Sequence, residues 1–181
     1  DTQWLIERLE EEAQKEHPEK LRYVLRDLAA ESGAFAYEYT GYLANIHSVE
    51  TYYQANIDML DLHKFYSLFS PNQKIHTKVK NEEPTYYAPG CEVNTSQFAS
   101  GSIVEGKVVR SVVSRNVQIH KDSLVKESIV FPRVVIGEGA QVEYAIIDKG
   151  AEVAEGVVIR GTAENPVVIK KGEKVTEDIL S

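Results

Sequence analysis

The chain has 181 residues, of which 43% are hydrophobic and 27% are charged, and its net charge at pH 7 is −8. This length allows one domain, or one domain and part of another. An acidic chain without clustered basic residues argues against binding to nucleic acid, and no apolar run approaches the ~18 residues of a membrane span. A single cysteine excludes an internal disulfide framework, so we expect a cytoplasmic location.

Charge and composition both change near residue 62. Residues 1–62 contain 13 acidic and 5 basic side chains, whereas residues 63–181 contain 15 of each. The first part is aromatic with helical spacing, and the last part is rich in valine and isoleucine. We therefore predict an N-terminal part at 1–62, a linker at 63–90 that contains several prolines, and a C-terminal domain at 91–181.

Two helices are predicted at the start of the chain. In residues 4–16, apolar side chains fall on one face opposite a run of glutamates. A second helix has Pro18 in its first turn, apolar residues at helical spacing, and Gly33 as its C-terminal stop.

A strand and a third helix follow. Residues 34–39 alternate between small or polar and aromatic residues, and the Ser48 hydroxyl can cap a helix over 49–62.

The last part of the chain repeats with a constant step. Aliphatic residues recur at equal steps in the series Val108, Val125, Val142 and Ile159. Small residues that suit tight corners recur at the same step in the series Ser111, Ser128 and Ala145, and Ser96 precedes this second series by a slightly shorter step. Within a repeat, apolar residues recur about every six positions, which is the hexapeptide pattern of a parallel β-helix. Each coil has three faces, and stacked coils bury a valine and isoleucine column at about 4.8 Å per layer. We expect about five coils over 91–170, with a cap or a neighbouring subunit at the exposed strand edges.

Two motifs carry a family resemblance. Residues 41–49, GYLANIHSV, and 52–60, YYQANIDML, follow the predicted helix and strand. This order resembles the end of the nucleotidyltransferase domain in ADP-glucose pyrophosphorylases (glucose-1-phosphate adenylyltransferases). Those enzymes carry Gly-Tyr-Trp-x-Asp-Val-Gly-Thr-Ile and Tyr-x-x-Ala-Asn-x-Asp-Leu-Leu. The family continues through a proline-rich linker into a left-handed β-helix, and 96–106, 109–119 and 146–150 resemble its coils. The resemblance implies a mixed fold, in which a left-handed parallel β-helix follows the α+β C-terminal remnant of a nucleotidyltransferase domain.

The chain departs from the family motif at its metal position. The family's aspartate, a ligand of the catalytic Mg²⁺ that acts with ATP, is replaced by Asn45. Carboxylates hold such a metal, whereas the Asn45 side chain offers only a neutral carbonyl oxygen. Leu43 replaces the family's tryptophan, and His47-Ser48 replace its Gly-Thr. With residues 74–80, these changes resemble the non-catalytic, regulatory type of subunit. We therefore expect no catalytic, metal-binding or cofactor-binding residue here, although Asn45 has the alternative role of hydrogen bonding in a turn.

The resemblance also implies a larger protein. The family begins with a glycine-rich phosphate-binding loop, which these 181 residues lack, and we expect a C-terminal fragment. Its expected function is to assemble and regulate glucose-1-phosphate adenylyltransferase for glycogen synthesis, with the catalytic subunit and copies of itself as partners, and no nucleic acid or membrane. One alternative is a fragment of a catalytic subunit. Another is a hexapeptide acyltransferase that uses His120 as a base.

Other residues are expected to have structural roles. Cys91 is expected to pack at the start of the β-helix, and the arginines that some activator-responsive members carry in the coil of Gln141, Glu143 and Tyr144 are missing. The remaining histidines are expected at the surface: His17, His47, His63 and His76. Five tyrosines could form a sugar platform, but packing is the preferred interpretation: Tyr37, Tyr39, Tyr42, Tyr52 and Tyr53. Five lysines could attract an anion or remain solvated: Lys78, Lys80, Lys170, Lys171 and Lys174.

Overall fold

A computed structural model describes residues 2–70, 72, 75–78 and 81–181. It contains two compact units, unit 1 at Asp1–Thr40 and unit 2 at Gly41–Ser181. The expected boundary at residue 62 therefore differs from the observed one, because residues 41–62 belong with the coils. None of the helices in the described part of the chain is both long enough and apolar enough to cross a membrane.

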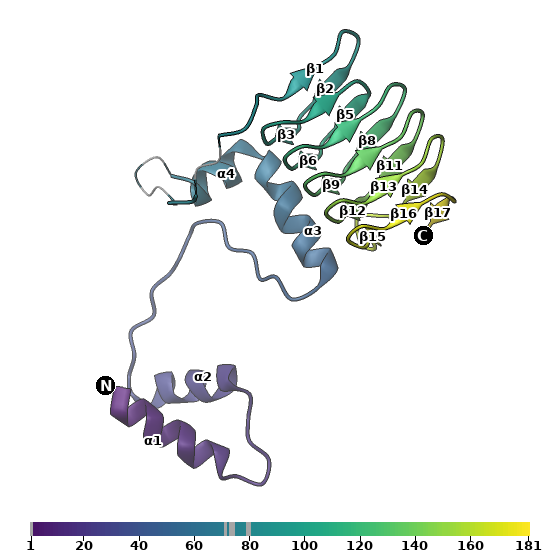
Figure 1. The fold of residues 1–181 in the computed structure, drawn as a ribbon. Coiled ribbons are helices and arrows are strands. Elements are labelled where there is room, and N and C mark those ends of the chain that lie inside the picture. Colours follow the sequence, from purple (N-terminus) through teal and green to yellow (C-terminus); the bar gives the residue numbers. More distant parts are fainter. Residues whose placement is uncertain (1, 71, 73–74, 79–80) are drawn as a thin grey trace. The chain divides into compact units, whose positions relative to one another are not determined.

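Unit 1 is built from two helices, α1 (Thr2–Ala13) and α2 (Leu21–Glu31) (Figure 1). Buried Val24 and Leu28 lie on the apolar face of α2, as the helical spacing predicts. Pro18 lies outside the first turn of α2, because the helix begins after Lys20, which is its N-cap. Gly33 has φ 65° directly after the C-cap, which is a conformation that glycine adopts without strain and that ends the helix.

The strand predicted at 34–39 is wrong, because these residues are described and adopt no strand. Phe35 and Tyr37 are exposed, so the alternating aromatic residues bury nothing here. A strand is stabilised by hydrogen bonds to a neighbouring strand, and the alternation in the sequence does not supply that neighbour.

Three short helices open unit 2: α3 (Val49–Ile57), the 3₁₀ turn η1 (Asp58–Leu60) and α4 (Leu62–Leu68). The Ser48 cap is confirmed, since its Oγ accepts from the Thr51 amide at 3.1 Å and Thr51 Oγ1 accepts from the Ser48 amide at 3.0 Å. The predicted helix 49–62 is divided in two because the Asp61 carboxylate caps α4, accepting from the His63 amide at 2.8 Å. The expected linker 63–90 therefore contains most of α4.

Three parallel sheets form the rest of unit 2 (Figure 1). Sheet A contains β1 (Tyr86–Tyr87), β4 (Ile103–Val104), β7 (Gln118–Ile119), β10 (Val135–Ile136), β13 (Glu152–Val153) and β16 (Lys174–Val175). Sheet B contains β2 (Glu92–Asn94), β5 (Lys107–Val109), β8 (Leu124–Lys126), β11 (Gln141–Glu143), β14 (Val158–Arg160) and β17 (Ile179–Leu180). Sheet C contains β3 (Gln97–Phe98), β6 (Val112–Val113), β9 (Ile129–Val130), β12 (Ala145–Ile147) and β15 (Val167–Ile169).

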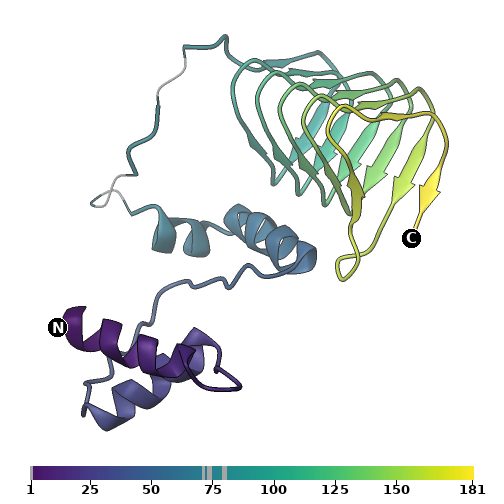
Figure 2. The ribbon, with the colours of Figure 1, turned by 60° about the horizontal axis from the view of Figure 1, so that its bottom comes forward.

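Each sheet contains one strand from each successive coil, so the chain is a parallel β-helix of about six turns, stacked as Figure 2 shows. The constant step of the sequence is confirmed by the pairs Val108↔Val125, Val125↔Val142 and Val142↔Ile159. The β-helix is longer than expected because β1 pairs with β4 from within the predicted linker and β17 extends it beyond residue 170. The left-handed winding stays a prediction from the family resemblance.

The core is the predicted column of valine and isoleucine side chains, almost all of them inaccessible to solvent. One corner of this column contains buried serines that bond adjacent coils. The Ser128 amide donates to Ser111 Oγ at 3.1 Å, and the Ala145 amide donates to Ser128 Oγ at 3.1 Å. The sequence predicts small residues at such corners, but not this hydroxyl ladder. It satisfies backbone amides that the corner would otherwise bury without a partner.

Candidate functional site

Helix α3 covers the outer face of sheet C. Adjacent residues of a strand point to opposite faces, so Ile129 and Ile146 face outward while their neighbours enter the core. Both isoleucines are buried against Tyr53 and Ile57 of α3. The Tyr53 hydroxyl donates to the Glu127 carbonyl oxygen at 2.7 Å, and burial raises the pKa of Tyr53. The helix is therefore part of the same packed body as the coils.

The apolar outer stripe of sheet C extends beyond this helix. Val168 pairs with Ile146 in the next coil, but its side chain is 48% exposed. A hollow of about 500 Å³ opens here, between the start of α3 and sheet C, and we call it the α3 groove. Its lining residues are Ile46, His47, Ser48, Val49, Tyr52, Phe131, Ile146, Asp148 and Val168.

Asn45 lies in the exposed segment that leads into α3. Its backbone carbonyl oxygen is 3.1 Å from His47 Nδ1, a contact that does not involve the Asn45 side chain. In the described part of the chain, no three His, Cys, Asp or Glu side chains are grouped so that they could hold a metal ion. The Asn45 side chain itself offers one neutral carbonyl oxygen and not the carboxylate that Mg²⁺ prefers.

Asp58 joins the segment before α3 to the two helices. It accepts from the Tyr42 hydroxyl at 3.0 Å and from Gln54 Nε2 at 2.9 Å, and it pairs with Lys64 Nζ at 2.7 Å. Burial raises the pKa of Asp58, but the bonds from Lys64, Gln54 and Tyr42 outweigh it and lower the pKa overall. Burial and the bond to Asp58 raise the pKa of Tyr42. This cluster fixes the direction in which the chain enters α3.

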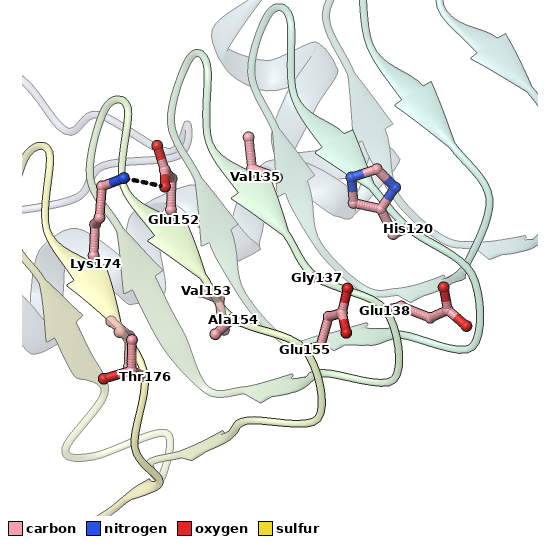
Figure 3. A pocket seen from close by; sticks show the side chains of 11 residues that line it. His120, Val135, Gly137, Glu138, Glu152, Val153, Ala154, Glu155, Lys174 and Thr176 are labelled. Carbon is pink, nitrogen blue, oxygen red and sulfur yellow. Dashed lines mark ion pairs between the residues drawn. The ribbon is translucent and has the colours of Figure 1, made fainter.

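A second hollow, of about 330 Å³, lies on sheet A beside His120 (Figure 3). His120 Nδ1 is 3.3 Å from Glu105 Oε2, and the equivalent positions of the next two coils are the small residues Gly137 and Ala154, which line the hollow. Three carboxylates also line it, from Glu138, Glu152 and Glu155, and Glu152 pairs with Lys174 at 2.8 Å. A histidine beside a carboxylate can accept a proton from a hydroxyl. The acidic rim, however, repels the phosphates of an acyl-CoA.

The remaining predicted residues are distributed over both units. Cys91 packs partly buried against the core, which confirms its structural role. The other four histidines are exposed: His17, His47, His63 and His76. Tyr37 and Tyr39 are exposed residues of unit 1, and Tyr52 and Tyr53 pack from α3 in unit 2. Glu143 lies between Lys126 at 3.7 Å and Arg160 at 2.8 Å. Lys78 is exposed, whereas Lys80 and residues 74 and 79 lie outside the described residues.

Known proteins share both the coils and the segment before them. Residues 81–178 match the family described as "GlmU-like, C-terminal hexapeptide". The chain is 36% identical to the glycogen biosynthesis protein GlgD of Bacillus subtilis, over 75% of this chain and 40% of that protein. It is 32% identical to the glucose-1-phosphate adenylyltransferase of Corynebacterium jeikeium, over 73% of this chain and 34% of the relative. The corresponding values for the Bacillus mycoides enzyme are 30%, 76% and 37%. These similarities confirm the resemblance to the ADP-glucose pyrophosphorylase family, and the chain spans less than half the length of these relatives.

Proposed function

Because the chain belongs to the GlmU-like, C-terminal hexapeptide family, we propose that it is part of a regulatory and assembly subunit of glucose-1-phosphate adenylyltransferase. The observation that carries this proposal is Asn45, a neutral side chain where the resemblance places a metal-binding aspartate. The similarity to a protein named for glycogen biosynthesis supports the same assignment. In this proposal the chain works in the cytoplasm, and its partners are the catalytic subunit and further copies of itself.

The role of the β-helix follows from its packing. Its interior is filled by aliphatic side chains, so no ligand enters the coils. Its outer faces carry rigid, regularly spaced side chains on short strands, which suits a surface that another subunit recognises. The helix α3 is packed on sheet C, so a partner that contacts either one is coupled mechanically to the other.

The test is to mix the subunit with the catalytic glucose-1-phosphate adenylyltransferase of its own organism and to measure pyrophosphate release from ATP and glucose 1-phosphate. We expect a change in rate or in substrate affinity, and no turnover by the subunit alone. Asn45→Asp should leave the effect on the catalytic subunit unchanged, because assembly and not metal binding produces it. An unchanged rate, affinity and subunit composition in the mixture would reject the proposal.

The second candidate is a fragment of a catalytic subunit. It is favoured by relatives named glucose-1-phosphate adenylyltransferase at 32% and 30% identity, close to the 36% of GlgD. In that case the subunit alone should turn over ATP and glucose 1-phosphate with magnesium. The acyltransferase alternative is not supported by comparable evidence, since the hollow at His120 is lined by three carboxylates.

A further inference from the structure

The corner between sheets C and A is basic through successive coils. Backbone bonds align these corners, since the Gly150 amide donates to the Pro132 carbonyl at 3.0 Å and the Gly172 amide to the Lys149 carbonyl at 3.1 Å. The side chains at this corner, which we call the basic corner, come from three consecutive coils: Arg133, Lys149, Lys170 and Lys171. Adjacent layers are about 4.8 Å apart, so these cations follow one edge of the β-helix.

Within the part of the chain that the structure describes, the cations of the basic corner have no acidic partner. Over residues 2–70, 72, 75–78 and 81–181, no carboxylate lies within 4.0 Å of their nitrogen atoms, whereas Arg115 at the same corner pairs with Glu82 at 3.0 Å. The two nearest acids in sequence are engaged with backbone. Asp148 Oδ1 accepts from the Lys149 amide at 2.6 Å, and Glu173 Oε2 accepts from the Lys170 amide at 2.8 Å. In a chain of net charge −8, this corner carries four cations, and the two carboxylates beside them, Asp148 and Glu173, keep their charge but form no ion pair with them among the described residues.

In each of these coils, the residues of the basic corner come directly after a residue that lines the α3 groove. Phe131, Asp148 and Val168 line the groove, and each precedes a corner cation by one or two positions. An apolar hollow therefore lies beside a basic edge on the same body. Apolar anchors within a charged rim are the usual composition of a protein interface, and the same stripe of sheet C already receives the apolar side chains of α3.

We propose that the α3 groove and the basic corner form one docking surface, and that its occupant is an acidic segment of the catalytic subunit with a large apolar side chain that fills the groove. This inference rests on the proposed function and specifies the surface that the partner contacts. The apolar side chain contacts Val168, Phe131 and Ile146, and the acidic residues pair with the cations of the corner.

The charge of the surface selects the kind of occupant. A second copy bound in a twofold dimer whose axis passes through the basic corner would bring one basic corner against another, and like charges across an interface are strongly unfavourable. A nucleic acid would gain only a few phosphate contacts here, and the chain around them is acidic overall. An acidic protein segment satisfies both the charge and the apolar hollow.

The test measures the affinity of the full chain for the catalytic subunit. Val168→Asp places a charge in the groove, Lys149→Glu with Lys171→Glu reverses the corner, and we expect each change to weaken binding by about tenfold or more. Lys121→Glu is the matched control, because Lys121 is exposed at another corner, and it should change the affinity less than about threefold. Added salt should weaken binding of the wild type and of the Val168 variant, but have much less effect on the corner variant.

The possible results distinguish a failure of this docking surface from a failure of the proposed function. If the wild type binds and the groove and corner variants bind equally well, the docking surface is wrong while the proposed function stands. If the wild type does not bind, the proposed function fails and this inference with it. Val168→Thr keeps a β-branched residue in β15 and should also weaken binding, so a folding defect in Val168→Asp cannot explain the result. Variants that change self-association of the chain without affecting partner binding would identify a second copy as the occupant and overturn the inference.

Discussion

The hydrogen bond between Tyr53 and the third coil predicts how strongly α3 is held to the β-helix. Tyr53 is 2% exposed, and its hydroxyl donates to the Glu127 carbonyl at 2.7 Å. Tyr53→Phe removes only that hydroxyl and leaves a buried carbonyl without this donor, at a cost of about 1–2 kcal/mol in the free energy of unfolding. Tyr53→Ala also removes the ring from among Ile57, Ile129 and Ile146, and should cost about 3–5 kcal/mol.

Urea denaturation followed by far-ultraviolet circular dichroism measures these differences. The only tryptophan, Trp4, belongs to unit 1, so its fluorescence reports on the other unit and should be unchanged in both variants. Tyr66→Phe is the control, because Tyr66 is 58% exposed, and it should cost less than about 0.5 kcal/mol. A Tyr53→Phe variant as stable as the control would show that the hydrogen bond does not hold α3, and a Tyr53→Ala variant that costs no more than Tyr53→Phe would show that the ring does not.

The raised pKa of Tyr53 adds a pH dependence to the same experiment. The unfolded chain ionises this phenol near pH 10, whereas the buried phenol keeps its proton to higher pH. The contribution to stability is therefore complete below pH 10 and decreases above it. Relative to Tyr53→Phe, the wild type should lose about 1.4 kcal/mol per pH unit above that point. A difference between the two proteins that stays constant from pH 8 to 11 contradicts this assignment.

Four further substitutions test other parts of unit 2 by the same denaturation assay. Ser128→Ala removes the acceptor for a buried amide of the next coil and should cost about 1–3 kcal/mol; wild-type stability would show that the serine ladder does not hold the coils together. Gly137→Ala places a Cβ 2.7 Å from the backbone of the next coil and should cost about 3 kcal/mol. Gly139→Ala, with open space but φ 67°, should cost about 1 kcal/mol, and equal costs for the two glycines would refute the close approach. Asp58→Asn removes a carboxylate of lowered pKa that pairs with Lys64, whose stabilisation is present above about pH 4 and lost as the pH falls further. The variant should therefore be less stable at pH 7 and lose less stability on acidification, and parallel pH profiles would contradict this.

The sequence predicts the β-helix well because its core is periodic. One aliphatic residue per face must point inward in every coil, so the constant step of Val108, Val125 and Val142 is visible without any structure. The cap at Ser48 is predictable because it consists of hydrogen bonds between residues of one helical turn, which are close together in the sequence. An insertion between β14 and β15 makes the step from Ile146 to Val168 longer than the step from Ile129 to Ile146. This insertion hides the last coils from a search at fixed spacing.

The groove and the basic corner could not be predicted in this way. Arg133, Lys149 and Lys171 are unequally spaced in the sequence. Lys149 and Lys171 lie at equivalent positions of two coils that the insertion separates, whereas Arg133 lies one position further along its own turn. The groove depends on where α3 begins on sheet C, and that position is fixed by a tertiary contact between Tyr53 and a coil far from it in the sequence. The strand predicted at 34–39 failed for a related reason, since alternation reports a preference for a sheet and not the presence of a neighbouring strand.

Native mass spectrometry of the chain expressed together with the catalytic glucose-1-phosphate adenylyltransferase of its own organism tests the central claim most directly. The claim is that this β-helix is a docking body for another subunit. We predict assemblies that contain both polypeptides in fixed ratio, and that are reduced by charge reversal at Lys149 and Lys171 but not at Lys121. Spectra that contain only separate assemblies of each polypeptide would contradict the claim.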